Sequence, residues 1–195
     1  PLMAVIVNGL FGHRYSHDLA HRFAWGSVLM SFLCVLAVFT ETLRTGAARE
    51  VVAYKWIFGG DLTINLAYLI DPLTCIMLLV ITGVGFLIHV YSVGYMHGES
   101  GFTRFFVYMN LFMVSMLLLV MGNNYVVLFI GWEGVGLCSY LLIGYYYDKV
   151  SAAKAATKAF VVNRIGDAGF LLAIFLVFVN FRTLDYTQVM QNAAQ

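Results

Sequence analysis

Long uninterrupted runs of apolar residues, separated by short polar segments, dominate the chain. A partial run covers residues 1–11, and full runs cover residues 23–40, 73–96, 105–121, 125–147 and 155–181. Each full run is close to the roughly 20 residues that a helix needs to cross a bilayer. In a bilayer only helices and closed barrels satisfy every backbone group, and barrel strands alternate apolar and polar residues. The pattern therefore predicts an all-α, polytopic transmembrane helical bundle with about six spans, five complete and one partial.

The polar connection over residues 41–71 has a different pattern. After a Phe-Gly-Gly-Asp segment at 58–61, apolar residues at 62, 64, 66 and 68 alternate with Thr63, Asn65 and Ala67. A turn followed by such alternation is typical of a β-hairpin. An irregular loop is an equally acceptable interpretation of this connection, so the sequence leaves both open.

The composition places the chain in a membrane. Of its 195 residues, 62% are hydrophobic and 11% are charged, whereas an average soluble domain is about 45–50% apolar and about 25% charged. A soluble enzyme, a nucleic-acid-binding protein and a disordered segment are thereby excluded. The net charge of +1 also provides no polybasic field for nucleic acid or for anionic lipid. Residues 1–11 are too short to cross a bilayer and the chain does not begin with methionine, so we expect a fragment of a longer protein.

Three cysteines lie in or beside apolar runs, namely Cys34, Cys75 and Cys138. Their spacing pairs none of them, so we interpret them as small buried apolar residues and expect no disulfide framework, zinc site or iron–sulfur site. We likewise find no dinucleotide fingerprint and no phosphate-binding loop. We therefore expect no cofactor and no metal in this chain.

Glu133 is the first candidate for chemistry, because it lies about a third of the way into an apolar run. A charge near the middle of a membrane helix costs several kcal/mol, so such a residue needs a partner and is a functional candidate by default. Loss of solvent favours the protonated form of a carboxylate and a nearby cation favours the ionised form, so a carboxylate balanced between them can exchange protons. A salt bridge that only locks two helices is the alternative. We prefer the functional interpretation, because apolar packing would join the helices at lower cost.

The second candidate cluster lies in the last run and contains Lys154, Lys158, Asn163, Arg164 and Asp167. Arg164 and Asp167 are separated by three residues, which predicts a pair on one helix face. Both are deep in the run, so we interpret them as functional. The two lysines are near its start, where long side chains can reach the interface, so a role in proton transfer and simple snorkelling are equally compatible with Lys158.

Other polar and small residues in the apolar runs receive simpler interpretations. His89 is the only ionisable group with a near-neutral pKa in its run, and we interpret it as a satisfied packing residue. Trp132 and the tyrosines at 145–147 are interpreted as packing or interface residues. Gly131, Gly134 and Gly136 predict close approach of a neighbouring helix or of water, and Gly166 and Gly169 predict close helix packing.

The residues around these candidates resemble a known family. Residues 131–144 read Gly-Trp-Glu-Gly-Val-Gly-Leu-Cys-Ser-Tyr-Leu-Leu-Ile-Gly, and residues 158–167 read Lys-Ala-Phe-Val-Val-Asn-Arg-Ile-Gly-Asp. Together with Asp71-Pro72-Leu73, residues 83–89 and residues 95–106, they resemble the subunit L family of NADH:quinone oxidoreductase (respiratory complex I), whose mitochondrial counterpart is chain 5. The resemblance covers most of the chain from about residue 71 to residue 178.

This resemblance implies an antiporter-like, proton-translocating membrane-arm subunit of an NADH:quinone oxidoreductase, with no redox centre in this chain. It implies that Glu133 pairs with a lysine on a helix beyond Gln195, and that Asp167 and Arg164 take part in proton transfer or coupling. Residues 72–195 would then be the first part of the antiporter-like domain, and residues 1–71 the N-terminal helices with their extramembrane connection. A Mrp-type cation/proton antiporter subunit is the alternative; the glycines beside Glu133 favour complex I.

The resemblance also implies partners and a location. The expected partners are other membrane-arm subunits of complex I, the lipid bilayer and protons as the transported ion, with no nucleic acid. We expect an integral protein of a bacterial cytoplasmic membrane, the mitochondrial inner membrane being the second choice.

Overall fold

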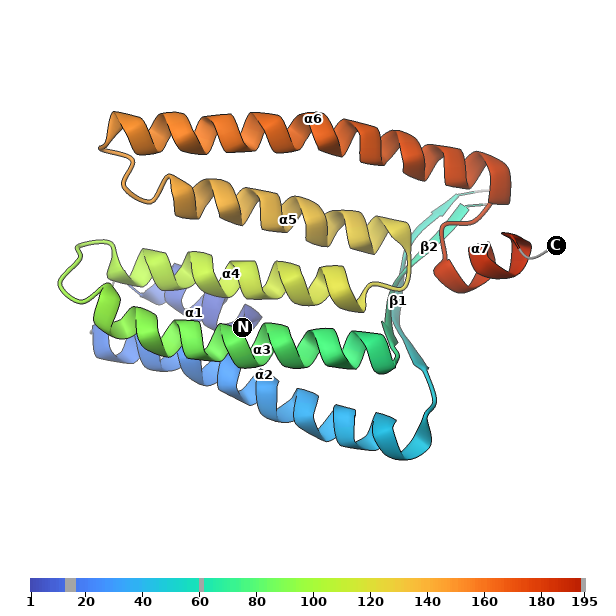
Figure 1. Ribbon diagram of the computed structural model, residues 1–195, viewed down its shortest axis with the longest axis horizontal. Coiled ribbons are helices and arrows are strands. Elements are labelled where there is room, and N and C mark those ends of the chain that lie inside the picture. The colour runs from blue at the N-terminus through green and yellow to red at the C-terminus, as the bar shows by residue number, and fades with distance from the viewer. Residues whose placement is uncertain (13–16, 60–61, 194–195) are drawn as a thin grey trace.

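The computed structural model of the chain describes residues 1–12, 17–59 and 62–193. These residues form helices α1 (Leu2–Phe11), α2 (His17–Thr45), α3 (Pro72–Tyr95), α4 (Phe102–Met121), α5 (Tyr125–Ile143), α6 (Val150–Phe181) and α7 (Tyr186–Ala193), and strands β1 (Arg49–Gly59) and β2 (Leu62–Ile70). Figure 1 shows α2 to α6 running along the length of the molecule, with both strands and α7 gathered at one end.

Five of the described helices are long and apolar enough to cross a membrane. They are α2 through Leu19–Thr45 and the whole of α3, α4, α5 and α6, and α1 is a shorter apolar helix. Large apolar side chains such as Leu73, Val84 and Ile165 are exposed on the outside of the bundle, where a bilayer would cover them. The chain is therefore an integral membrane protein, and the predicted helical bundle with five complete spans and one partial span is confirmed.

Capping residues explain where two of the helices begin. The Asp71 side chain accepts a hydrogen bond from the Thr74 backbone N–H at 2.7 Å, and Pro72 occupies the first turn of α3. The Asn124 side chain accepts from the Val127 backbone N–H at 2.9 Å at the start of α5. Both arrangements satisfy amides that a helix start leaves without partners.

Several helix ends differ from the apolar runs. The described part of α2 begins at His17, although residues 12–22 were predicted as a polar connection, and α6 begins at Val150 rather than at 155. Conversely, α5 ends at Ile143, so the tyrosines at 145–147 lie in the connection to α6. Residues 13–16 lie outside the described residues. Apolar runs mark the part of a helix inside hydrocarbon, and its backbone hydrogen bonds can continue into the polar interface.

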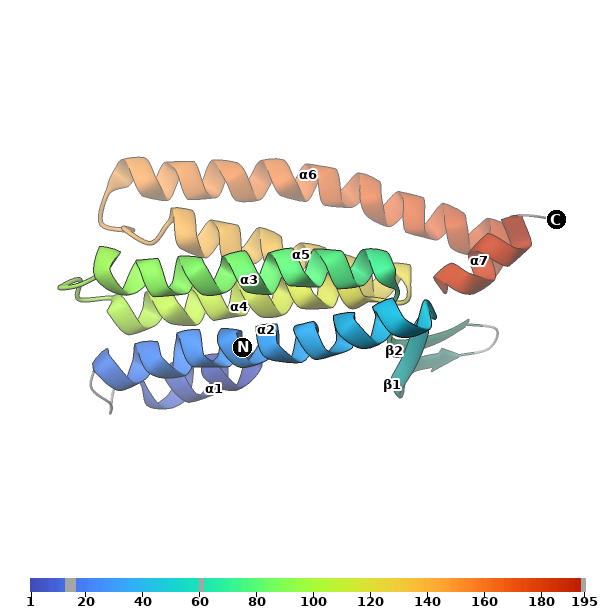
Figure 2. The same ribbon diagram turned by 60° about the horizontal axis from the view of Figure 1, so that its bottom comes forward.

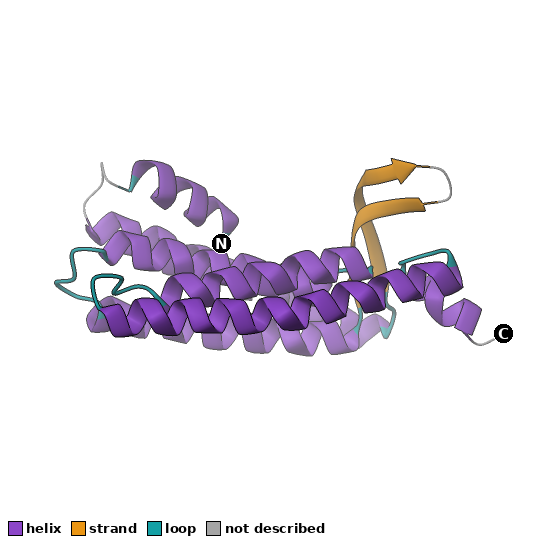
Figure 3. Cartoon of the chain, turned by 90° about the horizontal axis from the view of Figure 1, so that it is seen from above, coloured by secondary structure: helices purple, strands orange, loops and turns teal. Residues whose placement is uncertain are grey.

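The connection between α2 and α3 is a two-stranded antiparallel hairpin, which confirms the hairpin interpretation over the irregular loop. Arg49 pairs with Ile70 at its base and Gly59 pairs with Leu62 at its tip, with register shifts between Val52 and Tyr54 and between Lys55 and Ile57. The turn was predicted over residues 58–61, of which 60 and 61 lie outside the described residues. In Figure 2 and Figure 3 the hairpin stands off one end of the helices.

Two asparagines of the short α4–α5 connection hold this end together. The Asn123 amide donates to Glu50 Oε1 at 2.7 Å and to Asp185 Oδ2 at 2.9 Å, which links β1 to the segment before α7. The Asn124 amide donates to the Asn65 carbonyl of β2 at 2.8 Å. The connection between two membrane helices therefore also anchors the extramembrane hairpin.

The interior of the bundle contains polar as well as apolar side chains. His89 is fully buried, its Nδ1 lies 2.7 Å from the Gly85 carbonyl oxygen, and its ring lies against Phe106. This geometry agrees with a packing role, but the His89 Nε2 is buried without a hydrogen-bond partner among the described residues, so the ring is not fully satisfied as predicted. Cys75 and Cys138 are buried as predicted, but Cys34 is exposed. Its predicted burial is wrong because its side of α2 faces away from the other described helices.

Helices α4 and α5 pack closely because α5 presents glycines to α4. A Cβ atom on Gly131 would lie 2.5 Å from the Leu119 backbone nitrogen, and one on Gly134 would lie 2.5 Å from Ser115 Oγ. Real Cβ atoms do not approach that closely, so both positions need glycine. A Cβ atom on Gly136 would meet nothing within 4 Å. The predicted close approach is confirmed at Gly131 and Gly134, and Gly136 faces open space.

We expect Gly131→Ala to destabilise the full-length protein and Gly136→Ala to leave its stability unchanged or slightly higher. The new methyl group at 131 must displace the α4 backbone, an overpacking cost of about 1–3 kcal/mol, whereas both changes gain helix propensity of about 1 kcal/mol. Thermal unfolding in detergent compares the two variants. Equal unfolding midpoints would contradict the packing described here.

Candidate functional site

The candidate site lies where the middle of α5 faces α6. Glu133 lies eight residues after Tyr125, a distance of roughly 12 Å along the helix at 1.5 Å per residue. Its side chain is 23% exposed. The contact of Gly131 and Gly134 with α4 turns the adjacent residues of α5, Trp132 and Glu133, toward α6. The close packing on one side of α5 therefore fixes the direction of both side chains on the other.

Arg164 of α6 is placed between two carboxylates. Its Nη1 donates to Glu133 Oε2 across the helix interface and lies 3.7 Å from Asp167 Oδ2 on its own helix. The pair of Arg164 and Asp167 predicted from their spacing is confirmed. The guanidinium also lies over the Phe160 ring, with its carbon 4.8 Å from the ring centroid, a favourable cation–π position.

Asp167 is held more tightly than the other two members of the cluster. Its side chain is 7% exposed, and its Oδ1 accepts a hydrogen bond from Trp132 Nε1 at 2.8 Å. One carboxylate oxygen thus receives the indole N–H while the other faces Arg164. Buried charges persist only when hydrogen-bonded or paired, and Asp167 is both.

Glu133, Arg164 and Asp167 together contain two carboxylates and one cation. When all three are ionised the cluster carries one excess negative charge, and Arg164 can neutralise only one carboxylate at a time. The arrangement therefore leaves one of the two carboxylates without a cation of its own.

A cleft of about 660 Å³ opens beside this cluster, between α5 and α6. Its wall includes Trp132, Gly136 and Ser139 of α5 and Asn163 and Asp167 of α6. Polar side chains and a carboxylate on its wall allow it to hold water. Asp167 therefore lies on the wall of a cleft, whereas Glu133 is not among the residues that line it.

The structure separates Lys158 from these residues. Its side chain is exposed on α6 beside a surface hollow that also contains Lys154 and Tyr147. Among the described residues, Lys158 forms no ion pair with Glu133 or Asp167. Its predicted role in proton transfer stays a prediction.

One expectation from the sequence was incomplete and another needs correction. Trp132 packs its ring against Phe170, as expected of a packing residue, but it also donates a hydrogen bond to Asp167, which the sequence did not predict. Its position next to Glu133 was the available signal, because neighbouring residues on a helix can both reach a single facing helix. Close packing was expected at Gly166 and Gly169, yet a Cβ atom at either would meet nothing within 4 Å in the described chain. Gly166 borders the cleft between α5 and α6, where the two helices are not in close contact.

Two family models match the chain. Residues 56–106 match "NADH-Ubiquinone oxidoreductase (complex I), chain 5 N-terminus". Residues 122–195, which contain the whole candidate cluster, match "NADH:quinone oxidoreductase/Mrp antiporter, TM".

Individual relatives agree with these models. NADH-quinone oxidoreductase subunit L of Pseudomonas aeruginosa is 42% identical over 100% of this chain, and NADH-ubiquinone oxidoreductase chain 5 of Metridium senile is 40% identical over 100% of it. The chain spans 32% of the length of each relative. A chain in the structure of the membrane-bound sulfane sulfur reductase, an archaeal respiratory membrane complex, has the same fold, with a TM-score of 0.82 and 21% identity over 97% of this chain and 37% of that chain.

We expect Trp132→Phe to weaken the contact between α5 and α6. The variant keeps an aromatic ring but loses the N–H that binds Asp167, and a hydrogen bond to a charged group contributes about 1.5–3 kcal/mol. Because Asp167 keeps its contact with Arg164 in the variant, we expect a loss near the lower end, about 1.5 kcal/mol. Thermal unfolding of the full-length protein measures it.

Trp25→Phe is the matched control, because Trp25 lies on α2 and contacts Phe86 with its ring edge. It should lower the unfolding midpoint less than Trp132→Phe does. If the two variants lower the midpoint equally, the hydrogen bond to Asp167 does not stabilise the interface.

Proposed function

Because the chain belongs to the family of subunit L and chain 5 of NADH:quinone oxidoreductase, we propose that it forms part of a proton path through the membrane arm of that complex. Electron transfer in other subunits drives the path, and Glu133 loads and releases the proton. The observation that supports this most strongly is Arg164, which contacts Glu133 and Asp167 at once.

The proposed mechanism is a change in the position of a cation. While Arg164 contacts Glu133, its charge favours the ionised carboxylate and the proton leaves. When Arg164 moves toward Asp167, Glu133 loses this stabilisation and takes up a proton from water. Two opposite unit charges 4 Å apart attract by roughly 4 kcal/mol at an effective dielectric constant of about 20. Solvent reduces this figure here, because the Arg164 side chain is 47% exposed.

Asp167 is the alternative binding position for the arginine. The hydrogen bond from Trp132 keeps the Asp167 carboxylate in place, and the three-residue spacing keeps it within reach of Arg164 on the same helix. Arg164 can therefore exchange between two carboxylates by a side-chain movement without unwinding of α6. A lysine beyond residue 195, implied by the family resemblance, would compete with Arg164 for Glu133.

The assembly and its location belong to the same proposal. Relatives of this chain are named as subunits of NADH-quinone oxidoreductase, which supports other membrane-arm subunits as partners. The bacterial relatives support a bacterial cytoplasmic membrane. The chain 5 relative from Metridium senile supports the alternative, the mitochondrial inner membrane. The reaction would be that of the complete NADH:quinone oxidoreductase, to which this chain contributes proton translocation.

The second candidate function is cation/proton exchange by a Mrp-type antiporter subunit. It is favoured by the model that matches residues 122–195, which covers both protein classes. Sodium-driven proton exchange by the full-length protein in liposomes, without redox subunits, would favour the antiporter. Co-purification with redox subunits and the absence of such exchange would favour the respiratory complex.

We expect Glu133→Gln in the full-length subunit to abolish most redox-coupled proton pumping while the complex still assembles. The amide keeps the size of the side chain but cannot exchange a proton, and it removes the charge that attracts Arg164. Proton uptake into vesicles that contain the complex, measured per NADH oxidised, provides the test.

Glu41→Gln is the matched control, because Glu41 also pairs with an arginine, Arg49, at 2.7 Å, but at the exposed base of the hairpin. Its pumping should equal that of the unchanged protein. Full pumping by Glu133→Gln, or an equal loss in Glu41→Gln, would refute the assignment of Glu133.

A further inference from the structure

Asn123, in the short connection between α4 and α5, bonds several segments at once. It is fully buried, and in Figure 1 this connection lies beside the two strands. Its backbone N–H donates to the Ala67 carbonyl of β2 and its carbonyl accepts from the Tyr186 N–H of α7, both at 3.1 Å. Its side-chain Nδ2 donates to Glu50 of β1 at 2.7 Å and to Asp185 at 2.9 Å. One residue therefore joins both strands to the segment that follows α6.

The bond to Asp185 holds the end of α6 against the start of α5. Asp185 lies four residues after Phe181, the last residue of α6. The residue before it, Leu184, accepts a hydrogen bond at 3.1 Å from the backbone N–H of Tyr125, the first residue of α5. The Asn123 side chain adds a charge-assisted bond to this backbone contact. The end of α6 therefore shifts along α5 only if these bonds break.

Packed aromatic side chains connect this end of the bundle to the candidate site. Phe129 of α5 and Phe170 of α6 pack against the buried core that contains Leu184. The centroid of the Phe170 ring lies 5.6 Å from that of Phe129 and 6.0 Å from that of Trp132. Trp132 in turn donates to Asp167. Because a close-packed interior transmits displacements, a shift at Leu184 reaches the residues that surround Asp167.

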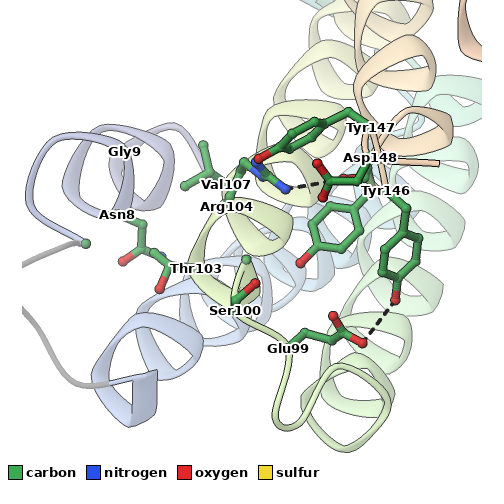
Figure 4. A pocket seen from close by; sticks show the side chains of 13 residues that line it. Asn8, Gly9, Glu99, Ser100, Thr103, Arg104, Val107, Tyr146, Tyr147 and Asp148 are labelled. Carbon is green, nitrogen blue, oxygen red and sulfur yellow. Dashed lines mark hydrogen bonds between the residues drawn. The ribbon is translucent and has the colours of Figure 1, made fainter. Parts of the chain in front are cut away.

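The start of α6 is held by different groups. They lie in the connection between α5 and α6, which contacts the region where α4 begins. Arg104 Nη2 donates to the Tyr145 carbonyl oxygen at 3.2 Å, and the Tyr146 hydroxyl donates to Glu99 at 3.3 Å, as Figure 4 shows. Helix α6 is thus anchored near both ends. A change at Asn123 therefore releases one end and leaves the other in place.

The two contacts of Arg164 respond differently to such a release. The contact with Glu133 crosses from α6 to α5, whereas the contact with Asp167 lies within α6. A shift of α6 along α5 therefore lengthens the first contact and leaves the second unchanged. Donor and acceptor in a hydrogen bond span only about 2.7–3.2 Å, so a small shift is enough. The position of α6 thus decides which carboxylate Arg164 favours.

We propose that Asn123 is a positioning residue for the contact between Arg164 and Glu133. By holding Asp185 at the start of α5, it keeps α6 where Arg164 reaches Glu133. Loss of this hold shifts Arg164 toward Asp167. The consequence for proton transfer rests on the proposed function of Glu133, whereas the effect on the contact itself does not.

Infrared spectroscopy of the complete resting complex tests the proposal through the carboxylate bands of Glu133, assigned with Glu133→Gln. These bands move when a carboxylate loses its arginine partner. We expect Asn123→Asp to shift them, because the new side chain has the same size but cannot donate to Asp185. The ratio of Arg164 on Glu133 to Arg164 on Asp167 should fall by up to about tenfold, the value of one hydrogen bond to a charged group.

Two double variants separate the bond to α6 from the bond to the hairpin. Asn123→Asp combined with Asp185→Asn restores a hydrogen bond, now donated by residue 185, and should return the Glu133 bands to their original position. Asn123→Asp combined with Glu50→Gln restores the bond to the hairpin instead, and the bands should stay shifted. Return of the bands in both double variants, or in neither, would overturn the proposal.

Single variants keep the test valid if Asn123→Asp does not assemble. Asp185→Asn and Glu50→Gln each remove the charge from one acceptor of the Asn123 amide and keep an acceptor oxygen. Only Asp185→Asn should shift the Glu133 bands, in the same direction as Asn123→Asp and by less. Unshifted bands in Asp185→Asn, or an equal shift in Glu50→Gln, would contradict the positioning role.

Proton pumping by the same variants separates this proposal from the proposed function. Shifted bands with pumping unchanged would support the positioning role of Asn123 and contradict the role of Glu133 in proton transfer. Unshifted bands, together with lost pumping in Glu133→Gln, would refute the positioning role and support the proposed function.

Discussion

The candidate site depends on one arginine that has two carboxylates within reach. Arg164 contacts Glu133 on the neighbouring helix and faces Asp167 on its own. Inside a membrane, an unpaired charge costs several kcal/mol of free energy. A carboxylate paired with one cation of its own avoids that cost but stays ionised. With two carboxylates and a single arginine, one carboxylate is always left without a cation. The cluster therefore has neither a lone charge nor a fully compensated pair. In the proposed function, this excess charge is what allows proton uptake by Glu133.

The rest of the fold supports that arrangement through unequal packing on the two sides of α5. On one side, Gly131 and Gly134 bring α5 against α4 so closely that no side chain fits between them. On the other side, α6 contacts α5 more loosely and leaves a cleft lined by Gly136 and Asp167. Because α5 is packed more closely against α4 than against α6, movement of α6 and its side chains disturbs fewer contacts than movement of α5. Charge displacement there does not require the bundle to repack.

The sequence predicted the bundle well because long apolar runs have few structural solutions in a bilayer. It predicted the pair of Arg164 and Asp167 because the spacing within one helix fixes it. It did not predict that Arg164 would reach Glu133 or that Trp132 would bind Asp167, because both contacts depend on how α6 is rotated against α5. The exposed Cys34 and the open faces of Gly166 and Gly169 have the same origin. Hydropathy identifies a span but does not say which of its faces meets protein.

Infrared difference spectroscopy of the complete complex during NADH oxidation tests the central claim most directly, with Glu133→Gln used to assign the carboxyl band. The account predicts a carbonyl stretch of a protonated carboxylic acid at Glu133 that appears and disappears with turnover. A Glu133 that stays ionised at every stage would contradict it, and so would one that stays protonated throughout.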